Sequence, residues 1–296
     1  MIKVKNIAII AIIYAIIAAL FYGISAPLSK LLLSELSPYT VSSLLYFGAG
    51  FGMLFIVLLR KTKPRDIVCE FHQKDVKYII LMIILDILAP ILLMFGLVST
   101  NASTASLLNN FEIVFTGVIA MVFFKEYIGK KMWIAITIII TSGILLAFED
   151  FTGFQISIGA LLVLAASLSW GLENNCTRML SHNDPLYVVI IKGLGSGLGA
   201  LIIALSLNQF GGPWVYILLT LLLGFVSYGL SLYFYISAQR HLGALRTSAY
   251  YSTAPFAGAL FSFVLLRESL SIIFVIAFLL MVLGTYFAIQ EIKNKA

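Results

Sequence analysis

Ten apolar stretches, separated by short polar or charged breaks, account for most of the chain. They cover residues 7–33, 38–59, 78–98, 102–124, 131–148, 156–180, 185–207, 214–237, 244–266 and 271–290. A helix needs about 20 apolar residues to cross the hydrocarbon core of a bilayer. Only 11% of the residues are charged, whereas a soluble domain carries about 25% to keep its surface wetted. The sequence therefore predicts an all-α membrane protein with ten transmembrane helices.

The basic residues indicate how these helices are oriented. The formal net charge is +6, but Lys and Arg gather at the ends of the apolar stretches rather than on one continuous face, which argues against nucleic acid as a partner. The loop at 60–77 is rich in Lys and Arg, and so are both chain ends. Because basic residues are retained on the cytoplasmic side, we expect a multi-pass protein of the cell (inner) membrane with both termini in the cytoplasm.

The chain also repeats itself. The pairs Lys125-Glu126 and Arg267-Glu268 are separated by the same interval, within one residue, as Gly143 and Gly284. We therefore predict two five-helix repeats, residues 1–148 and 149–296, within one integral membrane domain. Five is an odd number, so the second repeat must be inverted relative to the first. Inverted repeats with a site at their interface are a recurring plan of transporters.

These landmarks resemble the ten-helix EamA type of the drug/metabolite transporter superfamily. In that family each half ends with small residues, an apolar helix, a basic-Glu turn and a final helix containing Gly. The matching stretches here are 104–126 with Gly143 and 246–268 with Gly284. The sequence departs from the family pattern at Ile113, where relatives often have Pro, and at Ala254, the counterpart of Glu112. The resemblance implies a secondary transporter of small polar metabolites, with amino acids the leading class and export favoured over uptake.

Ionisable side chains inside apolar spans are the first candidates for a site, because burying them in a membrane is costly. Glu112, Glu173 and Asp86 lie within predicted spans. A carboxylate in a low-dielectric cavity can hold a cationic group or take up a proton. Alternatively, these groups join helices by hydrogen bonds, and Lys192 could pair with Glu173 or with a substrate carboxylate. Neighbouring amides that could line the same site are Asn109, Asn110, Asn174 and Asn175.

Aromatic side chains are the second group of candidates. Tyr22 and Trp170 occupy equivalent positions in the two repeats, and Tyr228, Tyr233, Tyr250 and Tyr251 lie in later spans. Such rings can hold an ammonium group by cation–π attraction, although aromatic residues also pack against lipid or in the core. The residues that we expect to bind substrate are Glu112, Glu173, Asn109, Asn110, Asn174, Tyr22, Trp170 and Tyr250.

No sequence pattern indicates an enzyme. The chain has no nucleotide-binding P-loop, and its Cys and His spacing does not fit a metal site or a cofactor. The expected partners are a small-molecule substrate, the lipid bilayer and protons as a coupling ion. Two alternatives to amino acid transport stay open, namely a multidrug or cation exporter and a membrane scaffold or enzyme without transport activity.

Overall fold

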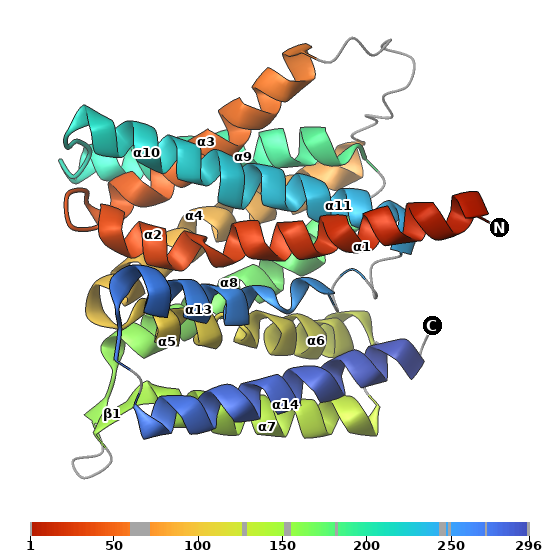
Figure 1. Ribbon diagram of the computed structural model, residues 1–296. Helices are drawn as coiled ribbons and strands as arrows, with labels where there is room; N and C mark the ends of the chain where they lie inside the picture. The colour runs from red at the N-terminus through yellow and green to blue at the C-terminus, as the bar shows by residue number, and fades with distance from the viewer. Residues whose placement is uncertain are drawn as a thin grey trace.

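A computed structural model describes residues 2–59, 72–125, 129–150, 155–180, 183–242, 247, 250–269 and 271–294. This part of the chain forms a bundle of long, roughly parallel and antiparallel helices, and both chain ends lie at the same end of the bundle (Figure 1). A chain that crosses a membrane an even number of times has both of its ends on the same side, as in this arrangement. Most of the basic loop, residues 60–71, lies outside the described residues. The cytoplasmic location of the termini stays a prediction, because the arrangement of the helices does not show which side of the membrane the termini occupy.

Each predicted span corresponds to one helix or to a series of helices end to end. The first five spans are α1 (Ile2–Gly23) with α2 (Ser25–Leu32), α3 (Pro38–Leu59), α4 (Val76–Ser99), α5 (Ala102–Leu108) with α6 (Phe111–Phe124), and α7 (Lys130–Ala147). The next five are α8 (Ile158–Met179), α9 (Pro185–Ser206), α10 (Trp214–Gly224) with the π-helix η3 (Phe225–Leu230) and α11 (Ser231–Leu242), α13 (Ala254–Leu266), and α14 (Ile272–Asn294). The predicted helical membrane architecture is confirmed.

Length and composition support the membrane assignment for most of these helices. Eight described segments are long and apolar enough to cross a bilayer, and α13 is a shorter apolar helix. Helix α8 has 22 residues but carries Glu173 and Arg178 within its last turns. Its start is capped by the side chain of Ser157, and that of α9 by Asp184 with Pro185 in the first turn, which are common helix-start signals.

Two short elements were not expected from the sequence. Strands β1 (Phe148–Asp150) and β2 (Gln155–Ile156) pair antiparallel between α7 and α8, and a 3₁₀ turn, η2 (Gln73–Asp75), precedes α4. The strands lie at the end of the bundle opposite the termini (Figure 1). They join the two predicted repeats and do not alter the helical architecture.

The distribution of side chains is that of a protein surrounded by lipid. Large apolar side chains face outward, including Phe123 at 72% exposure and Ile272 at 80%. The interior holds Asp86, Glu173 and Lys192, each less than a tenth exposed. In a soluble protein such charged residues are almost never fully buried unless they are paired. The outer surface therefore fits the hydrocarbon core, and the polar groups are gathered inside the bundle.

The packing contacts of the first five spans correspond to those of the last five. Helix α1 packs against α11 and α13, and its counterpart α8 packs against α4 and α6. Helix α3 packs against α10 and η3, and its counterpart α9 packs against α4. Other large contacts join a helix to its own counterpart, α3 to α9, α7 to α14 and α5 to α13. This arrangement has the contacts expected of two five-helix units related by a two-fold axis. The boundary between residues 148 and 149 stays a prediction.

Two details of the backbone recur at equivalent positions in the two groups of five spans. Lys125 and Arg267 both end their helices in the left-handed conformation, with φ of 54° and 53°, a conformation that is common after the last helical residue. At the crossing of α1 and α13, a Cβ on Gly23 would lie 3.0 Å from the backbone nitrogen of Gly258. At the equivalent crossing of α8 and α6, a Cβ on Gly171 would lie 2.6 Å from the Cβ of Phe115. Both crossings therefore require glycine.

Candidate functional site

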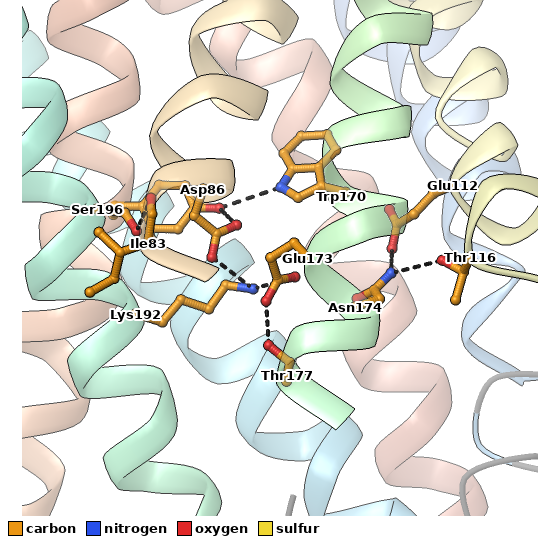
Figure 2. Close-up of polar contacts among 11 residues, drawn as sticks. Ile83, Asp86, Glu112, Thr116, Trp170, Glu173, Asn174, Thr177, Lys192 and Ser196 are labelled. Atoms are coloured by element: carbon orange, nitrogen blue, oxygen red, sulfur yellow. Dashed lines mark hydrogen bonds and ion pairs between the residues drawn. The ribbon is translucent and has the colours of Figure 1, made fainter. Parts of the chain in front are cut away.

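A buried ion-pair cluster joins three helices in the interior of the bundle (Figure 2). The Lys192 ammonium on α9 lies 3.1 Å from the Oδ2 atom of Asp86 on α4 and 2.9 Å from the Oε2 atom of Glu173 on α8. The side chains of both acids are almost fully buried, and that of Lys192 is 10% exposed. Ion pairing satisfies charges that would otherwise be costly in this environment.

Three neighbouring side chains hold the cluster in place. The Tyr46 hydroxyl on α3 donates a hydrogen bond to Asp86 Oδ1 over 2.7 Å, and Trp170 Nε1 donates to the Tyr46 hydroxyl over 3.4 Å. The Thr177 hydroxyl donates to Glu173. The cluster therefore connects α3, α4, α8 and α9. With all three charged groups ionised, two carboxylates face one ammonium, so the cluster has one excess negative charge.

Glu112 makes a separate contact on the other side of α8 (Figure 2). It lies in the first turn of α6 and is half-buried. Its Oε1 atom accepts a hydrogen bond from Asn174 Nδ2 over 2.6 Å, and the same amide lies 3.4 Å from the Thr116 hydroxyl. No Lys or Arg side chain in the described part of the chain forms an ion pair with Glu112. In the described part of the chain, the side chain that holds this carboxylate is a neutral amide.

A continuous group of tyrosine rings crosses the bundle next to these acids. The ring centroids of Tyr46 and Tyr228 are 5.3 Å apart, those of Tyr228 and Tyr22 are 5.9 Å apart, and those of Tyr22 and Tyr251 are 5.8 Å apart. Tyr228 belongs to the π-helix η3, and π-helical segments are frequent at functional sites. Glu112 is close enough to Tyr22, Tyr228 and Tyr251 to interact with them electrostatically.

A small pocket lies at the helix breaks beside the tyrosines. It is formed by the junction of α1 with α2, by α4 and α5, and by the start of α13. It has room for about one water molecule. The described residues that line it are Tyr22, Gly23, Ser25, Ala26, Leu93, Ser106, Asn109, Ala254, Pro255 and Gly258. Both groups of five spans contribute to this pocket.

The candidate residues from the sequence fall into different surroundings. Tyr22 and Asn109 line the pocket, and Asn174 binds Glu112. Glu173 belongs to the ion-pair cluster, and Trp170 bonds to the tyrosine of that cluster.

The other candidates lie farther from these groups. Asn110 Nδ2 donates to the Thr285 hydroxyl on α14 over 2.7 Å, away from the pocket. Tyr250 is not among the described residues that line the pocket, whereas the neighbouring Tyr251 packs against Tyr22. Sequence reasoning left Lys192 with two possible partners, and the structure pairs it with Glu173.

Tyr46 and Thr177 are parts of the cluster that the sequence did not indicate. Tyr46 lies in an apolar span and has no charged neighbour in the chain, so no local signal distinguishes it from the other tyrosines. Thr177 is four residues after Glu173, a spacing that places two side chains on one helical face. That spacing could have identified Thr177 as a partner.

Comparisons with known proteins agree on one family. The model of the EamA-like transporter family matches residues 9–148 and 157–290. A relative described as an uncharacterized transporter, from Methanothermobacter thermautotrophicus strain Delta H, is 30% identical over an alignment 291 residues long that covers 92% of this chain and 83% of the relative. A solved crystal structure covers 94% of this chain and 97% of its own, with a TM-score of 0.68 and 15% identity, which shows a shared fold. These findings confirm the resemblance noted in the sequence. The chain belongs to the EamA-like transporter family.

Proposed function

We propose that the protein is a secondary transporter that carries small amine-bearing solutes, amino acids or related amines, across the inner membrane. It works by alternating access, and the family resemblance favours export. The observation that supports this proposal is the carboxylate of Glu112. It lies within a membrane span, accepts a hydrogen bond from an amide, forms no ion pair with a described side chain, and interacts electrostatically with three tyrosines. A carboxylate beside aromatic rings is a suitable receptor for an ammonium group.

Alternating access is supported by the packing of the helices. Because the contacts of one group of five spans correspond to those of the other, two conformations of similar energy can be reached by exchanging their roles. The pocket lies where α1, α5 and α13 begin or end, and broken helices at mid-membrane are typical of transporter sites. The pocket is too small for an organic solute in this conformation, so a solute would bind after these helices separate.

Coupling to protons follows from the same carboxylate. Glu112 can bind a proton or an ammonium group, but it cannot bind both at once. A transporter in which the two compete would exchange one solute cation for protons moving in the opposite direction. In this scheme Glu173 and Asp86 retain Lys192 as their partner and keep a structural role.

A counterflow screen in liposomes tests the proposal. Purified protein is reconstituted, the vesicles are loaded with an unlabelled solute, and the uptake of the same labelled solute is followed. The panel contains amino acids, their amines and neutral sugars of similar size. We expect amine-bearing solutes to exchange and sugars not to exchange, and an imposed pH gradient to drive net accumulation. Exchange of sugars alone would contradict the proposal.

Two alternative functions predict different results. A multidrug or cation exporter would exchange bulky aromatic cations, and the packed rings of Tyr22, Tyr228 and Tyr251 are compatible with such ligands. A scaffold or membrane enzyme would give no exchange with any solute of the panel. The excess of buried carboxylates over ammonium groups favours a transported cation over the second alternative.

A further inference from the structure

We infer that the site selects amines that carry no carboxylate, so that decarboxylated amines, rather than amino acids, are the preferred solutes. This inference rests on the proposed function, because it concerns the same site next to Glu112. An amino acid needs a partner for its ammonium group and another for its carboxylate. The interior offers the first, whereas the two lysines that the structure describes deep in the spans, Lys192 and Lys30, are already paired and cannot serve as a cationic partner for the second.

The buried lysine of the cluster is not available to a substrate carboxylate. Its ammonium lies 3.1 Å from one carboxylate, on Asp86, and 2.9 Å from another, on Glu173. A third carboxylate would have to displace one of these two. The displaced group would then be buried with a negative charge and no cation, which is strongly unfavourable in a low-dielectric interior.

The second lysine within a span is also occupied. Lys30 Nζ donates to the carbonyl oxygens of Leu97, over 2.5 Å, and of Thr100, over 2.6 Å. These carbonyls belong to the end of α4, where backbone acceptors have no partner within the helix. The other Lys and Arg side chains that the structure describes belong to helix ends or to the turns between helices.

Backbone groups at the helix breaks offer little to a carboxylate. Helix starts can bind anions through free N–H groups, and α6 starts at such a break. Here the N–H groups of Glu112 and Ile113 donate to the carbonyls of Asn109 and Asn110, over 3.0 and 3.2 Å. The corresponding break before α13 is similar, because the Ala257 N–H donates to Thr253 over 3.0 Å, and Pro255 has no N–H.

An ammonium group, in contrast, has suitable partners from both groups of five spans. Glu112 supplies a carboxylate, and Tyr22 and Tyr251, whose ring centroids are 5.8 Å apart, supply aromatic rings. With all its groups ionised, the Asp86–Lys192–Glu173 cluster has one excess negative charge, and the charge of Glu112 adds to it. This field attracts a cation and repels the carboxylate of an amino acid.

The test compares each amino acid with its own decarboxylated amine. Phenylalanine, 2-phenylethylamine and phenylalanine methyl ester share one ring and one amine and differ in the carboxylate; leucine, 3-methylbutylamine and leucine methyl ester form a second set. The full-length protein is purified in detergent, and the shift in its unfolding temperature is measured with each compound, because a ligand that binds the native state stabilises it. We expect the amines and the esters to raise the unfolding temperature and the free amino acids to leave it unchanged.

Two variants connect the result to the site. Glu112→Gln should lose the stabilisation by amines, whereas Glu35→Gln, a matched change on an exposed turn, should keep it. Stabilisation by amino acids equal to that by their amines would overturn the inference and leave the proposed function standing. An absence of stabilisation by every amine would also overturn the inference, and sugar exchange without amine exchange in liposomes would overturn the proposed function itself.

Discussion

Replacing Lys192 by methionine should strongly destabilise the protein. Methionine keeps an unbranched side chain of similar length but removes the ammonium that lies 3.1 and 2.9 Å from two carboxylates. Asp86 is fully buried and Glu173 is 1% exposed, so neither carboxylate can be hydrated in compensation. Removing one partner of a buried ion pair costs about 3–5 kcal/mol. We expect a loss of this size in the free energy of unfolding.

Reversible unfolding in a detergent titration measures this loss, with Lys130→Met as the control. Lys130 is exposed at the start of α7, and its replacement should change the free energy of unfolding by less than about 0.5 kcal/mol. The combined variant Asp86→Asn, Glu173→Gln and Lys192→Met removes all three charges and should recover most of the stability, since neutral replacement of a buried ion cluster is often tolerated. If Lys192→Met is as stable as the control, the cluster does not stabilise the fold and our reasoning is refuted.

Three further predictions concern the surroundings of the site and the topology. Thr177→Val removes the hydroxyl that donates to Glu173 and should lower the free energy of unfolding by about 1 kcal/mol, measured by the same titration; an unchanged value would contradict this bond. Gly23→Val should disrupt the crossing of α1 and α13, where a Cβ would lie 2.9 Å from a backbone oxygen, whereas Gly117→Ala has open space around it; equal yields of folded protein from both would refute the packing. A reporter that is active only outside the cytoplasm should stay inactive when fused after Lys295, because the basic residues are expected to be retained inside, and activity would reverse the proposed orientation.

The fold could be predicted from the sequence because a membrane imposes a simple rule. Apolar stretches of about 20 residues must become helices, since lipid offers no partner to an exposed backbone, and each of the ten stretches contains helix in the structure. The repeat was visible because its landmarks, such as Lys125 and Arg267, have a conformational role and share the left-handed backbone. The short strands at Phe148 were not predicted, because three residues carry no recognisable period.

The site was only partly predictable, because the position of a residue within a predicted span does not determine which side chains it contacts. Glu112 and Glu173 look alike in the sequence, both being followed or preceded by asparagines. They differ because α9 brings Lys192 to Glu173, whereas the described side chain that binds Glu112 is an amide. Tyr250 and Tyr251 are adjacent in the chain, and the helical turn decides which ring meets Tyr22. Such choices depend on how the helices rotate against each other.

The measurement that tests the central claim most directly is the exchange rate of Glu112→Gln in liposomes, followed from acidic to alkaline pH. Glutamine keeps the size of the side chain and its hydrogen-bonding partner but removes the charge. A hydrogen bond to a charged group contributes about 1.5–3 kcal/mol, and each 1.4 kcal/mol is a factor of ten, so we predict a loss of amine exchange of about tenfold or more and a rate that no longer varies with pH. Folded Glu112→Gln protein that exchanges amines at the wild-type rate, with the wild-type pH profile, would contradict the assignment of Glu112 as the substrate-binding carboxylate.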